Sequence, residues 1–78
     1  DGNGISKSKP DPEVFLRAAQ LLGLQPAQCL VVEDATAGIL AAYRGGFDSA
    51  GLGDAALDKL TTYPLQQFSQ LNGILLQH

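Results

Sequence analysis

The short apolar run Cys29–Val32 most constrains the fold, because helical patterns flank it on both sides. The run is continuous rather than alternating, which is typical of a parallel strand covered on both faces. Along the chain, the expected order is helix, strand, helix, a weaker strand and a terminal helix. Alternation of this kind predicts right-handed crossover units and a parallel sheet, so the fold class expected is α/β.

The first helix has clear boundary signals. Asp11 is a good N-cap, Pro12 suits the first helical position, and Gly23 is a natural C-terminal stop. Apolar residues between them recur at helical spacing. The sequence therefore predicts a helix over 12–22.

The part of the chain after the apolar run carries weaker signals. A second helix is expected over 36–44, and we interpret Gly38 inside it as a sign of close packing on the sheet. A strand over 47–52 is a weak prediction, because Ser, Gly and Asp are poor strand formers. Thr61–Tyr63 indicates a small strand, and Pro64 is expected to open a last helix.

Two adjacent carboxylates follow the apolar run directly. Glu33 and Asp34 come after Val32, and ligands of parallel sheets sit beyond the carboxyl ends of the strands. Carboxylate oxygens are also ligands that suit Mg²⁺. The pair therefore predicts a metal site. The alternative is that one carboxylate caps the next helix while the other is solvated.

A second candidate group precedes the first helix. Lys9 has the charge to neutralise a transferring phosphoryl group, and the Ser8 hydroxyl has the chemistry to donate to a phosphate oxygen. The alternatives are a solvated loop lysine, which is how we interpret Lys7, and a turn serine.

Composition argues against several classes of function. The net charge is −3 and there is no basic patch, which argues against a nucleic-acid partner. No apolar run reaches the roughly 18 residues of a membrane span, so no membrane partner is expected. Cys29 is the only cysteine, and we expect it to be a buried strand thiol rather than half of a disulfide. The setting expected is cytoplasmic.

Two segments together resemble motifs III and IV of the haloacid dehalogenase (HAD) superfamily. They are Lys9–Phe15 (KPDPEVF) and Val32–Ala42 (VEDATAGILAA), and Gly51–Leu57 is similar to the stretch after the last core strand. The resemblance covers about residues 1–60 and is greatest to the β-phosphoglucomutase-like branch. It implies that 1–78 is a partial, C-terminal piece of a Rossmann-like HAD core domain.

The resemblance also implies roles for individual residues. Lys9 would contact the phosphoryl group, Asp34 would ligate Mg²⁺, and Glu33 would be the second acid. In the family the reaction passes through a phospho-aspartate. The implied substrate is a hexose phosphate, with β-glucose 1-phosphate to glucose 6-phosphate as the leading reaction. A HAD sugar-phosphate phosphatase and a non-catalytic remnant or interaction module are the alternatives.

Other parts of the family pattern are missing from the 78 residues. Motif I, D-x-D-G, supplies the nucleophile, whereas Asp1–Gly4 reads D-G-N-G and belongs to a loop. Motif II and the helical cap are also absent. We therefore expect the isolated chain to be inactive and Leu30–Val32 to keep an unpaired strand edge. That edge is expected to bind a missing N-terminal half or to mediate self-association.

Overall fold

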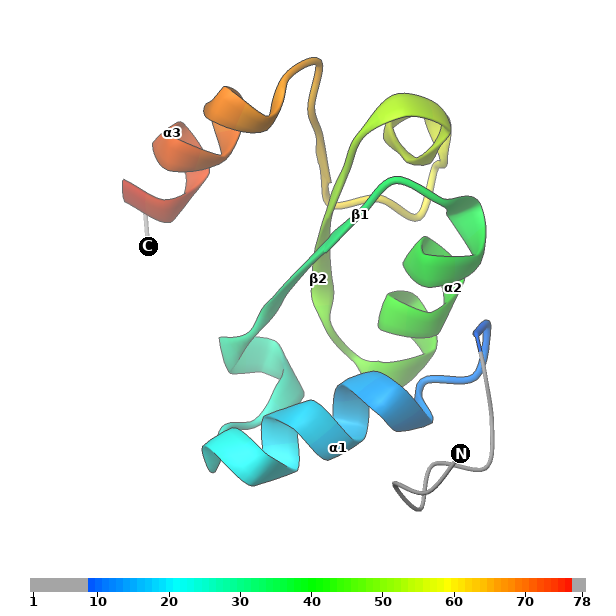
Figure 1. The fold of residues 1–78 in the computed structure, drawn as a ribbon, viewed down its shortest axis with the longest axis vertical. Coiled ribbons are helices and arrows are strands. Elements are labelled where there is room, and N and C mark those ends of the chain that lie inside the picture. Colours follow the sequence, from blue (N-terminus) through cyan, green and yellow to red (C-terminus); the bar gives the residue numbers. More distant parts are fainter. Residues whose placement is uncertain (1–8, 77–78) are drawn as a thin grey trace.

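The computed structural model describes residues 9–76, and its centre is a parallel sheet. The strand order is β1–β2–β3, with bounds Leu30–Glu33, Asp48–Gly51 and Tyr63–Pro64. Strands β1 and β2 are joined through a helix, as the expected α/β fold requires (Figure 1). The parallel α/β prediction is confirmed for this part of the chain.

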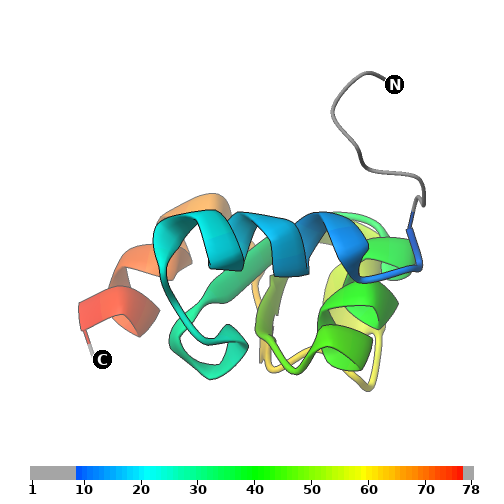
Figure 2. The ribbon, with the colours of Figure 1, turned by 90° about the horizontal axis from the view of Figure 1, so that it is seen from below.

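In the described part of the chain, three helices and three short 3₁₀ turns flank the sheet. The helices are α1 (Glu13–Leu22), α2 (Thr36–Gly45) and α3 (Leu71–Leu76), and the turns are η1 (Pro26–Gln28), η2 (Gly53–Leu57) and η3 (Phe68–Gln70). The N-terminal half of α1 lies next to α2, and α3 lies across the strands from α2 (Figures 1 and 2). Within residues 9–76, no helix combines the length and the apolar character needed to cross a bilayer.

Helix α1 begins and ends close to the predicted residues. The Asp11 carboxylate accepts a hydrogen bond of 2.9 Å from the backbone N–H of Glu13, and Pro12 directly precedes the helix. Gly23 adopts a left-handed conformation (φ 71°), and its N–H closes on the last turn of the helix. The local signals at both ends therefore confirm a helix here.

The core lies where α1, α2 and the start of β2 meet. Ala19, Ala42 and Phe47 form a buried cluster, and partly buried side chains that include Phe15 pack against it. The rings of Phe15 and Phe47 meet edge to face, with 6.0 Å between their centroids. Ile39 of α2 is fully buried. Helix α1 thus contributes a small part of its apolar face to the core.

Strand β2 forms despite its poor intrinsic strand propensity. It is the middle strand, and its Ser49 is buried at 2% exposure. The N–H of Ser49 donates to Thr62 Oγ1 at 3.0 Å, and the N–H of Thr62 donates to Ser49 Oγ at 3.3 Å. Small side chains and this reciprocal pair of bonds explain why the weak prediction over 47–52 is confirmed.

The predicted helix start at Pro64 is wrong. Pro64 lies in β3, and the following Leu65 is buried and donates its N–H to the Gly51 carbonyl at 2.8 Å. This bond extends the strand pairing beyond Pro64, so the chain reaches helix α3 only at Leu71. β3 is therefore a two-residue strand that ends in a proline at one edge of the sheet.

The other edge of the sheet, β1, is less buried than its apolar sequence predicts. In the described part of the chain β1 pairs with β2 alone, and Val32 is 36% exposed. Cys29 precedes the strand and is half-buried, with its Sγ 3.5 Å from the Gln25 carbonyl oxygen. The predictions of a strand covered on both faces and of a buried strand thiol are wrong here, because Val32 is exposed and Cys29 lies outside the strand, half-buried against the core cluster.

Candidate active site

The carboxyl ends of β1 and β2 form one edge that brings candidate residues together. Glu33, the last residue of β1, pairs in register with Gly51, and the Glu33 carbonyl accepts a 2.9 Å bond from the N–H of Leu52. Asp34 follows at the turn into α2. This is the edge at which parallel sheets place ligands.

Lys9 lies against this edge. Its Nζ is 2.8 Å from Oε2 of Glu33, and the side chains are 38% and 13% exposed. The same ammonium lies 5.3 Å from the centroid of the Phe15 ring, within cation–π range. The structure thus brings together two candidates that are far apart in sequence.

Asp34 has a different environment. It is exposed, and among residues 9–76 no hydrogen bond or ion pair involves its side chain. Its carboxylate is therefore available to water or a cation. The remaining candidate, Ser8, lies outside the described residues.

The donor set suits a metal that needs few protein ligands. Residues 9–76 contain no cluster of three or more His, Cys, Asp or Glu side chains placed to hold an ion. Mg²⁺ usually keeps several waters and takes one or two carboxylates together with substrate phosphate oxygens. Glu33 and Asp34 fit that requirement as a partial set of hard oxygen donors.

Sequence reasoning did not assign Gly38 and Phe15 to the site. An added Cβ at Gly38 would meet the Glu33 carboxyl group first, so the close approach involves that side chain. The signal was present, because glycine is costly in a helix interior. For Phe15, nothing in the sequence distinguished a ring that only packs in the core from one that also contacts Lys9.

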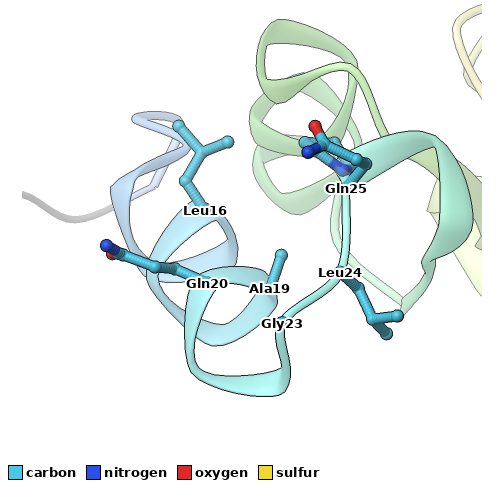
Figure 3. A pocket seen from close by; sticks show the side chains of 7 residues that line it. Leu16, Ala19, Gln20, Gly23, Leu24 and Gln25 are labelled. Atoms are coloured by element: carbon cyan, nitrogen blue, oxygen red, sulfur yellow. The ribbon is translucent and has the colours of Figure 1, made fainter.

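Two pockets adjoin α1, and neither Glu33 nor Asp34 lines them. One, of about 430 Å³, is lined by α1 and the segment that follows it, and none of its lining residues is charged (Figure 3). Another, of about 260 Å³, lies between α1 and β1 and is lined by apolar side chains that include Phe15, Leu22, Leu30 and Val32. Neither contains the groups that phosphoryl chemistry requires. We call the second one the α1–β1 groove.

Comparison with known proteins gives the family. Residues 1–46 match the model of a family described as hydrolase, haloacid dehalogenase-like hydrolase. A crystal structure of a HAD hydrolase, family IA, variant 3, from Entamoeba histolytica HM-1:IMSS superimposes with a TM-score of 0.77. It is 25% identical and covers 88% of this chain and 34% of that one. The fold is therefore part of a Rossmann-like HAD core.

Curated relatives include a phosphoglucomutase and several phosphatases. The β-phosphoglucomutase of Bacillus subtilis (strain 168) is 45% identical over 53 residues, which is 68% of this chain and 24% of that protein. Hexitol phosphatase A of Escherichia coli (strain K12) is 50% identical over 42 residues, or 54% of this chain and 19% of that protein. The chain thus spans about a quarter or less of these relatives.

Proposed function

We propose a function from the premise that this chain belongs to the haloacid dehalogenase-like hydrolase family. The chain carries the edge of a phosphoryl-transfer site that binds phosphate and Mg²⁺, with a hexose phosphate as substrate. The observation that carries this proposal is the 2.8 Å contact between Lys9 and Glu33 at the carboxyl end of β1, beside Asp34. A cation and two carboxylates at one sheet edge are the charges that such a site needs.

Each side chain has a distinct task in this proposal. Asp34, exposed at the turn, and Glu33 would hold Mg²⁺, directly or through water. When bound, Mg²⁺ screens the negative charge of the phosphoryl oxygens. The Lys9 ammonium neutralises the phosphoryl group as a point charge. Its contact with Glu33 keeps that charge at the sheet edge before substrate arrives.

The reaction that we favour is the interconversion of β-glucose 1-phosphate and glucose 6-phosphate. The support is the similarity to a β-phosphoglucomutase over 68% of this chain. A sugar-phosphate phosphatase is the second candidate, because relatives named as phosphatases reach 50% identity over shorter segments. A non-catalytic remnant is the third. The cytoplasmic location stays a prediction.

The nucleophile must come from elsewhere in this proposal. A lysine and two metal-binding acids at the edge do not form the phospho-aspartate that the family reaction requires. Because the chain spans about a quarter or less of its relatives, we propose that a further segment of a longer protein supplies that aspartate. The same segment would pair with the open edge of β1 and fill the α1–β1 groove.

One assay of the complete protein separates these candidates. The protein is incubated with β-glucose 1-phosphate and Mg²⁺, and glucose 6-phosphate and free phosphate are both measured. Formation of glucose 6-phosphate supports the mutase, and release of phosphate alone supports the phosphatase. If neither forms and weak Mg²⁺ binding is unchanged by Glu33→Ala with Asp34→Ala, the protein is a non-catalytic remnant.

A further inference from the structure

Gly38 occupies an unusual position for a glycine. It is buried in the first turn of α2, at the third residue of the helix. Glycine is among the least favourable residues inside a helix, so its presence here needs a cause. Its φ lies outside the left-handed range, so backbone conformation does not require a glycine here. The remaining cause is a lack of space for a side chain.

That space is filled by the side chain of Glu33. A Cβ added at Gly38 would overlap the Oε1 and Cδ atoms of Glu33 and would lie 2.5 Å from its Cγ. Because Cγ is also too close, turning the carboxylate about its last bond would not relieve the overlap. The Glu33 side chain would have to leave its rotamer about the Cα–Cβ bond.

The two oxygens of the Glu33 carboxylate face different partners. Oε1 lies against the first turn of α2 at Gly38, and Oε2 accepts the 2.8 Å bond from Lys9 Nζ. The amino-terminal end of a helix favours a negative charge, so this position suits an ionised carboxylate. A rotamer change at Glu33 would move Oε2 and break the contact with Lys9.

We propose that Gly38 is a positioning residue that acts through Glu33. Its missing side chain creates the seat in which the Glu33 carboxylate lies against α2, and the seated carboxylate fixes the ammonium of Lys9. The seat itself follows from the geometry of these three residues. Its importance for phosphoryl transfer rests on the proposed function.

A double-mutant cycle in the complete protein tests this seat. Gly38→Ala, Glu33→Ala and their combination are compared with the native protein by two measurements. One is the NMR signal of the ¹⁵N-labelled Lys9 ammonium group, and the other is the thermal unfolding midpoint. Gly38→Ala is expected to move the Lys9 signal to the position that Glu33→Ala gives, and the double variant should move it no further.

The unfolding midpoint gives an independent readout. With Ala at position 33 the clash is gone, so Gly38→Ala should raise the midpoint because alanine is the better helix former. With Glu33 present the rise should be smaller or reversed. Gly73→Ala in α3 is the matched control, because no heavy atom lies within 4 Å of its added Cβ. Its effect should be equal in both backgrounds.

Every outcome decides the inference. The inference would be contradicted if Gly38→Ala leaves the Lys9 NMR signal unmoved. It would also be contradicted if Gly38→Ala changes the unfolding midpoint equally in the native and the Glu33→Ala backgrounds. If Gly38→Ala alone does not fold, folding of the double variant supports the seat and its failure to fold overturns it. If the effects of Gly38→Ala and Glu33→Ala are coupled but the protein does not transfer phosphoryl groups, the positioning role of Gly38 is supported and the proposed function is contradicted. If the protein transfers phosphoryl groups but the two effects are not coupled, the proposed function is supported and the positioning role is contradicted.

Discussion

Lys9 is held by two chemically different neighbours. Its ammonium contacts the Glu33 carboxylate at 2.8 Å and lies 5.3 Å from the centre of the Phe15 ring. A solvated loop lysine would have neither neighbour. Exposed ion pairs contribute only about 0–1 kcal/mol to stability, so holding Lys9 in place does little for folding and more for orientation.

Replacing Lys9 is therefore expected to separate activity from stability. In the complete protein, Lys9→Ala should lower phosphoryl transfer by about 10²–10³-fold, the usual effect of removing one group that stabilises transition-state charge. The unfolding free energy should fall by no more than about 1 kcal/mol. Turnover and denaturant unfolding measure the two effects. Lys59→Ala, at an exposed lysine in the turn after η2, is the control, and an equal loss of activity there would contradict the role of Lys9.

Asp34 offers the corresponding test for the metal. Asp34→Asn removes a charged oxygen donor and should weaken Mg²⁺ binding about tenfold or more, since even outer partners of metal ligands contribute roughly 10–100-fold. Titration calorimetry with MgCl₂ measures the affinity. Asp48→Asn changes another exposed aspartate, at the start of β2 and away from the carboxyl-end edge, and should leave binding unchanged. Equal affinities of native protein and Asp34→Asn would remove Asp34 from the site.

At the scale of elements, local signals predicted α1 and α2 well and failed after residue 63. The bond from the Glu13 N–H to the Asp11 carboxylate, a first-turn glutamate and a left-handed glycine define α1 from within its own sequence. By contrast, Pro64 stands before residues with helical spacing but lies in a strand, because Leu65 bonds to the Gly51 carbonyl across the sheet. A bond between distant segments leaves no trace in local periodicity.

The end of β2 depends on a close approach that only glycine permits. An added Cβ at Gly51 would meet the backbone carbonyl of Ala55 and would lie 2.9 Å from Thr61 Cγ2. Because backbone cannot swing aside, Gly51→Ala should lower the unfolding free energy by about 1–3 kcal/mol. Urea denaturation measures this loss. Gly73→Ala, with open space around it, should change stability by less than that and in the stabilising direction.

At the scale of the whole molecule, the order of strands and helices predicted which edge of the sheet carries Glu33 and Asp34, whereas the meeting of Lys9 with Glu33 was implied by the two motifs and not by the strand order. The carboxyl end of a parallel strand placed Glu33 and Asp34 at one edge, as expected from the strand order. The seat at Gly38 was not predictable, because it depends on the rotamer of one glutamate rather than on any repeat in the sequence.

The molecule also exposes apolar surface beside an open strand edge. Val32 is 36% exposed, Leu22 is 70% exposed, and the α1–β1 groove between α1 and β1 is lined by apolar groups. We expect the isolated 78-residue chain to self-associate through this edge, and Val32→Lys should shift it toward monomer because edge lysines block strand pairing. Sedimentation velocity measures the change. Leu57→Lys, at an 86% exposed leucine in η2, should have no effect, and a monomeric native chain would contradict the prediction.

The two-residue strand β3 has a further consequence. Its Pro64 cannot donate a backbone hydrogen bond, so the sheet has one edge that accepts a new strand and one that does not. Two copies that join through their β1 edges would leave only the blocked edges at the outside. Strand pairing would therefore end at a closed pair and could not propagate into a fibre.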